Sequence, residues 1–518
     1  MFDIYRPSYT RILDIQESEG SYYWSGTAAS LFRSFGYIAL KTIEVSSDEL
    51  LSPDNGRTQI ILRSCEPPKD VFGGQSRIWE TPTKTIIDGF FEGSAVSKEI
   101  IPEATLLDAE KKVIGKLFRQ LVRVKDRDQK IVRLNTDQGL WHTGSMNVQV
   151  WPDSYGIVLA WLALEDGRQV PAVIKIGQDL IFTFPVFDIL GEWFGFPPLD
   201  ERYAGIEGGF APTTCFDFLS KLIEEHHLGC ASEVIVKARP FPAPYKNGMT
   251  IRHDYDRPIS DESWFELLRF YETKGIRASF GFLGYLQPPH IIEVVENHGH
   301  EVNFHCYAHT EYELRQQLSS LTELTQQGVD GVTIHGGPSG MGFRGETHYW
   351  FFEHSKFLYS ECYGVRNVHY SPLARIVDNV PVTSEQQIAP PYHYSLDVST
   401  RLGEHKLESL KKELPLALRS ENYVVLMNHP DIHREALYEL INGLDLSLTW
   451  TPTLREAMEF YYATRQKAIM ITRDNQLIVS LGKIISNPAT FEVIRPGKVP
   501  EIKQISVPAG SQHTSIPK

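Results

Sequence analysis

The side chains most suited to chemistry lie in two short segments near the middle of the chain. Asp254 and Asp256 form an Asp-x-Asp in Ile251-Arg-His-Asp-Tyr-Asp256, and His305 and His309 follow in His305-Cys-Tyr-Ala-His309. One carboxylate and two imidazoles can hold a divalent ion on three sides and leave its other positions to water and substrate, while the second carboxylate can act as a base. This combination is typical of a hydrolytic metal site.

The expected chemistry gives each of these residues a role. An unactivated amide or ester is split by a nucleophilic water, and a bound divalent metal lowers the pKa of that water to about 7. We assign Asp256, His305 and His309 as the metal ligands, with zinc as the first choice of ion. Asp254 is the expected general base; we place it on the opposite side of the extended chain from Asp256 and expect a bend at the strand end to bring it to the water.

Two further residues complete the expected catalytic set. A general base needs a cationic or hydrogen-bonding partner that keeps it ionised and oriented, and Arg344, in Gly340-Met-Gly-Phe-Arg-Gly345, is the candidate partner of Asp254. His429 ends the apolar run that begins at Val424, so it should point into the site and protonate the leaving amine as a general acid.

The elements that must position these residues alternate between strand and helix. The expected strands are 249–253, 277–283, 301–305, 331–335, 364–369 and 423–428, and the expected helices are 262–274, 290–297 and 311–327. Strict alternation implies parallel strands covered by helices. The candidate residues fall at or just after the carboxyl ends of these strands, where active sites form in a β/α barrel, so we expect an α/β barrel rather than an open sheet.

The rest of the chain divides around this barrel. Residues 1–238 are expected to form a separate mixed α/β domain of unknown role, with strands at 59–63, 156–164 and 169–176 and a helix at 216–227. Residues 239–247 form a Pro-rich linker. The barrel then covers 248–465, and residues 466–518 form a β-type extension that ends in a flexible tail.

Composition excludes several classes of protein. The net charge of −14 argues against a broad binding surface for nucleic acid, which needs concentrated Lys and Arg. No apolar run approaches the roughly 18 residues of a membrane span, and the start of the chain lacks the features of a signal peptide, so we expect a cytoplasmic protein. The five cysteines are scattered and odd in number, which favours reduced thiols, and Cys306 is expected to be buried and to point away from the metal.

These residues, in this order, resemble the polysaccharide deacetylase family, also called the NodB-homology or carbohydrate esterase 4 group. The resemblance covers residues 248–464. The acidic pair of that family's first motif corresponds to Asp254 and Asp256, and the second motif closely matches Gly299-His-Glu-Val-Asn-Phe-His-Cys-Tyr-Ala-His309. Arg344 corresponds to the arginine of the third motif and His429 to the late histidine. The resemblance implies a distorted (β/α)7 barrel and a metal-dependent carbohydrate deacetylase.

The chain also departs from the family pattern. The commonest members have a contiguous Asp-Asp where this chain has Asp254-Tyr-Asp256, a form that resembles the Asp-x-Asp subset of the family. Prolines usually follow the arginine of the third motif, but here the sequence is Gly345-Glu-Thr, which leaves open the backbone N–H that would steady the oxyanion. His335-Gly-Gly-Pro338 has no counterpart in the common motifs, and we expect it to line the substrate cleft.

The sequence therefore predicts an N-deacetylase of an N-acetylated sugar or glycan precursor in surface-polysaccharide assembly. A cytoplasmic location would favour a small nucleotide-linked or lipid-linked sugar. Two alternatives stay open: a deformylase or other carbon–nitrogen hydrolase, and a non-catalytic carbohydrate-binding barrel. A homo-oligomer is also possible. A dinucleotide-binding oxidoreductase is disfavoured because its Gly-rich motif should open the first βαβ unit, and a serine hydrolase because Met341 replaces a required glycine.

Overall fold

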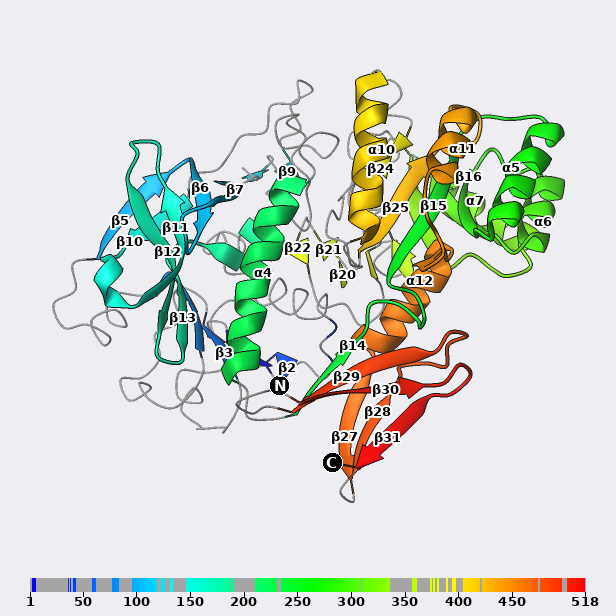
Figure 1. The fold of residues 1–518 in the computed structure, drawn as a ribbon. Coiled ribbons are helices and arrows are strands. Elements are labelled where there is room, and N and C mark those ends of the chain that lie inside the picture. The colour runs from blue at the N-terminus through cyan, green and yellow to red at the C-terminus, as the bar shows by residue number, and fades with distance from the viewer. Residues whose placement is uncertain are drawn as a thin grey trace.

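In the computed structural model, the helices and strands form three groups (Figure 1). N-terminal strands lie on one side, alternating strands and helices from the second half of the chain lie on the other, and the last strands lie below both. The structure describes residues 2–5, 36, 38, 41–42, 58–61, 77–82, 96–118, 123–125, 131–133, 146–187, 189–190, 210–230, 234–308, 310–335, 356–360, 373–374, 376–377, 380–381, 388–389, 394–396, 404–419, 422–473, 476–495 and 501–517.

The alternating part is built on a ten-stranded, mainly parallel sheet. Its strands in spatial order are β20 (Leu373–Ala374), β23 (Ile388–Ala389), β19 (Tyr359–Ser360), β18 (Gly331–Ile334), β17 (Glu301–Cys306), β16 (Ala278–Leu283), β15 (Asn247–Tyr255), β25 (Tyr423–Asn428) and β24 (Tyr394–Ser395), and β26 (Thr449–Trp450) also pairs with β15. All of these pairs are parallel except β20 with β23. A short antiparallel pair, β21 (Ile376–Val377) and β22 (Val380–Pro381), lies apart.

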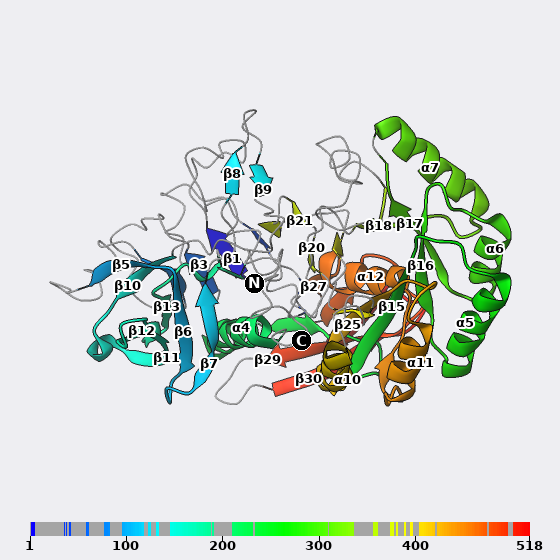
Figure 2. The same ribbon diagram turned by 90° about the horizontal axis from the view of Figure 1, so that it is seen from above.

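Helices cover one face of this sheet. They are α5 (Asp261–Lys274), α6 (Pro289–Asn297), α7 (Glu311–Leu324), α10 (Glu404–Arg419) and α11 (Arg434–Asn442), and α12 (Leu454–Tyr461) follows β26. Figure 2 shows α5, α6 and α7 along the outer side of β15 to β18. The ends of α5 follow from its sequence, because the Ser260 side chain caps the first turn and Gly275 adopts the left-handed conformation just after the last turn.

The two faces of these strands differ sharply in polarity. In β17, the residues Val302, Phe304 and Cys306 belong to the apolar core shared with the helices. The alternate residues of the same strands are buried but mostly polar: Thr250, Arg252, Asp254, Ser279, Glu301, Asn303, His305 and Thr333. Because successive side chains of a strand point to opposite faces, the concave side of the sheet is lined with polar groups. Cys306 therefore lies on the helix side, away from these groups.

The N-terminal part is a nine-stranded mixed sheet. Its order is β2 (Lys41–Thr42), β1 (Phe2–Tyr5), β3 (Thr58–Ile61), β4 (Arg77–Glu80), β13 (Asp179–Phe182), β12 (Gln169–Ile176), β11 (Ile157–Ala163), β6 (Glu103–Asp108) and β7 (Val113–Phe118). Two short pairs accompany it, β5 (Ser97–Ile101) with β10 (Met146–Val150) and β8 (Arg123–Lys125) with β9 (Ile131–Arg133). A 3-10 turn spans Asp153–Tyr155. The helix α4 (Phe210–Cys230) packs on this sheet through Leu219 and Ile223.

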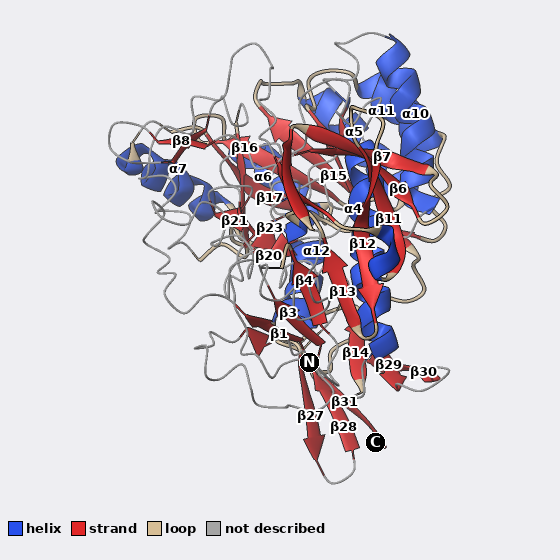
Figure 3. Cartoon of the chain, turned by 90° about the vertical axis from the view of Figure 1, so that its left-hand side faces the viewer, coloured by secondary structure: helices blue, strands red, loops and turns tan. Residues whose placement is uncertain are grey.

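The last strands pair with one another and with a strand that precedes the large parallel sheet. β14 (Ile235–Ala238) pairs with β29 (Ala489–Arg495), which pairs with β30 (Glu501–Val507). A second sheet contains β27 (Ile469–Arg473), β28 (Gln476–Ser480) and β31 (His513–Pro517), and Figure 3 shows it at one end of the molecule. The last described residues, in the segment that the sequence predicts to be a flexible tail, form β31. The Pro-rich segment 239–247 is also packed, because Phe241 lies in an apolar core.

Most of the expected elements agree with the structure. The parallel alternation from β15 to β18 and the helices α5, α6 and α7 confirm the predicted arrangement, with each end within three residues of its predicted place. The strand expected at 364–369 lies outside the described residues. Closure of the sheet into a seven-stranded barrel and the separate N-terminal domain stay predictions. Within the described part of the chain, no helix is long and apolar enough to cross a membrane.

Candidate functional site

Neighbouring strands of the large sheet bring the candidate residues to one edge. Asp254 is the penultimate residue of β15 and Asp256 follows its end, while His305 is the penultimate residue of β17. His335 comes directly after β18 and His429 directly after β25. Because these parallel strands are adjacent or separated by one strand, their carboxyl ends meet at the same edge. We call these five residues the rim cluster. His309 and Arg344 lie outside the described residues.

Asp256 stands at the centre of the rim cluster. Its Oδ1 lies 3.4 Å from Nε2 of His305, and its Oδ2 lies 3.3 Å from Nε2 of His335 and 3.1 Å from Nε2 of His429. Burial opposes ionisation of Asp256, but the contacts with the three imidazoles outweigh it and hold the pKa of this carboxyl well below its ordinary value. Asp256 is therefore an ionised carboxylate to which three ring nitrogens converge.

Asp254 is held by a partner on its own strand. Arg252 donates from Nε to Oδ1 at 3.0 Å and from Nη2 to Oδ2 at 2.6 Å, and the two side chains are only 3% and 6% exposed. Burial favours the neutral acid, but the charge of Arg252, followed by that of His305, lowers the pKa of Asp254 below its ordinary value. Asp254 is therefore ionised at neutral pH, as a general base must be.

The expectation that Asp254 and Asp256 face opposite sides of the chain is wrong. Residues two apart on a strand share a face, and both carboxylates approach His305: Oδ1 of Asp254 lies 3.7 Å from its Nδ1, and Oδ1 of Asp256 lies 3.4 Å from its Nε2. The same alternation explains Arg252, which lies two residues before Asp254. The sequence therefore contains the signal for this ion pair: the described partner of Asp254 is Arg252, while the predicted partner, Arg344, lies outside the described residues.

His305 is oriented by a neighbouring strand. Its Nδ1 lies 2.9 Å from Oγ1 of Thr333, the residue that pairs with it in the register of β17 and β18. A proton on Nδ1 would be donated to Thr333, which leaves the lone pair of Nε2 directed toward Asp256. In the other tautomer the Thr333 hydroxyl donates to Nδ1 and Nε2 can donate to Asp256, so in either form the ring is oriented with Nε2 toward Asp256.

Gly281 provides the space that these side chains occupy. It pairs with Asp254 on one side and with Asn303 on the other. A Cβ at Gly281 would lie 2.7 Å from Oδ1 of Asn303 and 3.1 Å from Oγ1 of Thr333, closer than side chains tolerate. The missing side chain therefore allows the polar groups of β17 and β18 to fill the concave face beneath the rim.

Some of the oxygen and nitrogen atoms of the rim cluster are placed as the ligands of a divalent ion would be. Within the described residues, no group of three or more His, Cys, Asp and Glu side chains is arranged to hold a metal ion. However, Oδ1 of Asp256 is buried without a hydrogen-bond partner there. Metal–ligand bonds of about 2.0–2.1 Å give ligand separations of about 3.3–3.4 Å at a tetrahedral centre. The distance from Oδ1 of Asp256 to Nε2 of His305 is 3.4 Å, and the distance from Oδ2 of Asp256 to Nε2 of His335 is 3.3 Å. Each of these two distances has this size.

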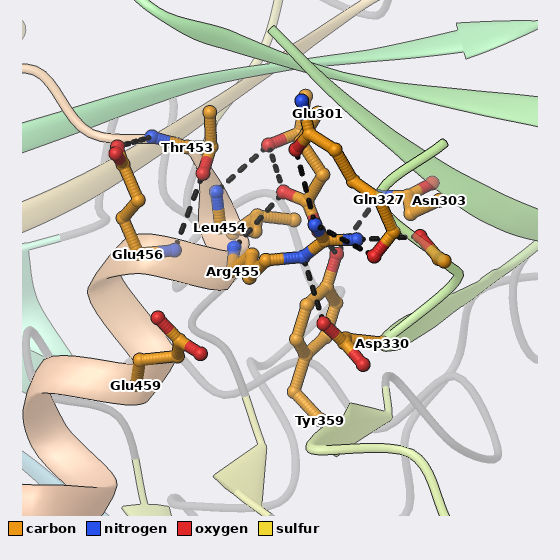
Figure 4. Close-up of polar contacts among 12 residues, drawn as sticks. Glu301, Asn303, Gln327, Asp330, Tyr359, Thr453, Leu454, Arg455, Glu456 and Glu459 are labelled. Carbon is orange, nitrogen blue, oxygen red and sulfur yellow. Dashed lines mark hydrogen bonds and ion pairs between the residues drawn. The ribbon is translucent and has the colours of Figure 1, made fainter. Parts of the chain in front are cut away.

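A second buried polar cluster lies at the opposite end of the same strands (Figure 4). Glu301, the first residue of β17, accepts hydrogen bonds from the hydroxyls of Ser279 and Tyr359 at 2.7 and 2.8 Å and from the backbone N–H of Arg455 at 2.9 Å. The Tyr359 hydroxyl also accepts a hydrogen bond from Asn303 at 3.0 Å. We call these five residues the floor cluster. They attach the start of α12 to β16 and β17, and so fix the strands that carry the rim.

The comparison with known proteins found similarity to solved structures. No protein-family model and no curated protein matches the chain. A candidate polysaccharide deacetylase from Mycobacterium smegmatis is 18% identical, with 46% of this chain and 98% of that chain covered and a TM-score of 0.31. A polysaccharide deacetylase from Bacillus cereus is 12% identical, with 40% and 91% covered and a TM-score of 0.27. A pseudoenzyme of the carbohydrate esterase 4 family from Bacillus anthracis is 14% identical, with 42% and 66% covered and a TM-score of 0.28.

Proposed function

We propose that this protein is a metal-dependent hydrolase that removes the N-acetyl group from an amino sugar. The observation that carries the proposal is the rim cluster: an ionised Asp256 approached by three imidazoles, next to an ionised Asp254 that Arg252 holds separately. This arrangement would offer ligands for a cation and a base at the same carboxyl ends of the strands. The deacetylase motifs described above add to it, because four of the five rim residues, Asp254, Asp256, His305 and His429, also carry the resemblance.

Asp256 and His305 would hold the ion, together with His309 as the sequence predicts. When bound, a divalent ion such as zinc supplies Lewis acidity at the acyl oxygen and at the attacking water. The chain's own groups do the remaining work. Thr333 keeps the ring of His305 in one orientation, and the Arg252 guanidinium keeps Asp254 fixed and charged.

Two residues of the rim cluster, Asp254 and His429, would transfer the protons. Asp254 accepts a proton from the attacking water, since its pKa lies below the ordinary value and the group is ionised at neutral pH. His429 delivers a proton to the leaving amine, and its Nε2 lies 3.1 Å from Asp256, which orients the ring toward the site. The finer proposal, a glycan precursor of surface polysaccharide as substrate in the cytoplasm, rests on sequence reasoning.

The direct test is a hydrolysis screen with metal analysis. Purified protein is analysed for bound metals and incubated with N-acetyl and N-formyl amino sugars, and released acetate and formate are measured. We expect metal to co-purify and acetate to be released. Replacement of the exposed Glu266 by Gln on α5 is the matched control, since this carboxylate lies outside the rim and its loss should leave the rate unchanged. Formate alone would favour the deformylase alternative, and metal without either acid would favour a binding protein.

A further inference from the structure

His335 is the residue of the rim cluster that has no part in the proposed reaction. It comes directly after β18, and its backbone N–H donates to the carbonyl oxygen of Cys306 at 3.1 Å, which continues the pairing of β17 with β18. Its ring makes edge-to-face contacts with the rings of His305 and Tyr307, at centroid distances of 5.5 and 5.0 Å. Backbone and ring are therefore both held in place, and Nε2 lies 3.3 Å from Oδ2 of Asp256.

The two oxygens of Asp256 have different surroundings. Oδ2 lies near two imidazole nitrogens, Nε2 of His335 at 3.3 Å and Nε2 of His429 at 3.1 Å. Oδ1 faces Nε2 of His305 at 3.4 Å and is buried without a hydrogen-bond partner among the described residues. Oδ2 is therefore held by the chain, whereas Oδ1 is the oxygen available to an ion.

Of the two imidazoles at Oδ2, His335 is the one that can stay there during the reaction. In the proposed function His429 delivers a proton to the leaving amine, so its Nε2 has to turn to the substrate. With a proton on its own Nε2, His335 can donate to Oδ2 throughout. A carboxylate that binds a metal is usually itself hydrogen-bonded, which fixes its orientation.

We propose, on the basis of the cation site in the proposed function, that His335 is a positioning residue: it holds Oδ2 of Asp256, so that this carboxylate binds the ion through Oδ1 alone. Binding through one oxygen leaves more positions on the ion to water and the acyl group.

This role differs from that of a further metal ligand. A separation of 3.3 Å suits a long hydrogen bond and also two ligands of one ion, so the choice of oxygen decides between the two roles. His305 faces Oδ1, whereas His335 faces Oδ2. Within the part of the chain that the structure describes, no group of three or more His, Cys, Asp and Glu side chains is arranged to hold a metal ion. The geometry therefore favours His335 as the residue that holds Asp256.

The zinc affinity of the full chain tests this role without catalysis. Zinc is titrated into the metal-free protein in competition with a chromogenic chelator. His335→Ala should weaken zinc binding about 10–100-fold, the usual effect of losing a group that orients a metal ligand. His335→Gln should restore most of the affinity, because its amide N–H can donate to Oδ2, whereas an amide replaces imidazole poorly as a zinc ligand. Lost packing of the ring alone would not be restored by Gln.

His290→Ala is the matched control. His290 lies on α6, outside the rim cluster, and its Nε2 makes the same kind of contact, 3.2 Å from Oδ1 of Asp261. Its side chain is 63% exposed, so its loss also reports any zinc that binds to surface imidazoles. The zinc affinity of this variant should equal that of the unchanged protein.

The proposal is overturned if His335→Ala binds zinc as tightly as the unchanged protein, or if His335→Gln binds it as weakly as His335→Ala. It is also overturned if crystals grown with zinc place the ion within bonding distance of Nε2 of His335. The proposed hydrolase fails in a different way. Zinc affinity that depends on His335, in a protein that releases no acetate, would keep the positioning role and overturn the hydrolase. Acetate release with full zinc affinity in His335→Ala would overturn the positioning role alone.

Discussion

The large parallel sheet carries the buried carboxylate of Glu301 at one end and the partly buried carboxylate of Asp256 at the other, and the two ends are built differently. In the floor cluster both oxygens of Glu301 accept hydrogen bonds, from Tyr359 on one side and from Ser279 and the backbone of Arg455 on the other. In the rim cluster, Oδ1 of Asp256 accepts no hydrogen bond from the described residues. The carboxylate of Glu301 is satisfied within the protein, whereas that of Asp256 is left able to bind something else.

This difference separates stability from function. A saturated buried network joins its elements firmly, and the floor cluster accordingly joins α12 to β16 and β17. An unsaturated buried group costs free energy in the folded protein and is retained where a ligand completes it. Changes at Asp256 and the imidazoles around it should therefore reduce activity more than stability, and changes at the floor should do the reverse.

The largest effect is expected at Asp254. Asp254→Asn removes the general base and should lower acetate release by about 10²–10⁴-fold, while metal content by elemental analysis stays near that of the unchanged protein. His305→Ala should lose both activity and metal. Equal loss of metal in the two variants would contradict the division into base and ligand.

At the rim, the ion pair between Arg252 and Asp254 should contribute most to the free energy of unfolding. Arg252→Leu leaves the buried Asp254 carboxylate without its cation, and we expect a loss of about 3–5 kcal/mol in the free energy of unfolding, measured by urea denaturation. The double variant Arg252→Leu, Asp254→Leu should recover much of this loss, because neither charge remains. A double variant as unstable as the single one would argue against the pairing.

Substitutions in the floor cluster should change the free energy of unfolding and leave metal binding unchanged. Tyr359→Phe removes a buried hydroxyl that donates to Glu301 and accepts from Asn303, so unfolding should become easier by about 1–3 kcal/mol. Metal content should not change. Tyr312→Phe, at an exposed position, is the control and should leave the melting temperature unaltered. Loss of metal in Tyr359→Phe would show that the two clusters are not separable.

A smaller effect is expected in the pH dependence of stability. Burial raises the pKa of Glu301 above its ordinary 4.5, against the charge of Arg455 and the hydrogen bonds of Ser279 and Tyr359. A raised pKa in the folded state contributes stability below pH 4.5 that is lost as the pH rises through the folded-state value. Glu301→Gln removes this dependence, so its stability deficit should be larger near pH 4 than near pH 7. A deficit that grows with pH would mean that the pKa is lowered instead.

The strands and the rim were predictable because they depend on local patterns. Alternation of β-rich and amphipathic runs located β15 to β18, and the position of polar residues at strand ends located Asp254, Asp256 and His305. Arg252 could also have been found, since it lies two residues before Asp254 on the same face.

The floor cluster could not be read from the sequence. Glu301 and Tyr359 are 58 positions apart, and Glu301 and Arg455 are 154 apart, so only the folded sheet reveals that they meet. The same holds for the pairing of β14 with β29, which joins residues assigned to the N-terminal half to the C-terminal extension. Long-range pairing leaves no periodic signal in either segment, and the alternation of polar and apolar residues does not name the partner strand.

Anomalous diffraction at the zinc absorption edge, on crystals grown with zinc, tests most directly whether the rim is an ion site. The account predicts one strong peak within bonding distance of Asp256 and His305, with Asp254 still paired to Arg252. A zinc-free rim in the presence of bound zinc elsewhere, or Asp256 and His305 directed to separate places, would contradict it.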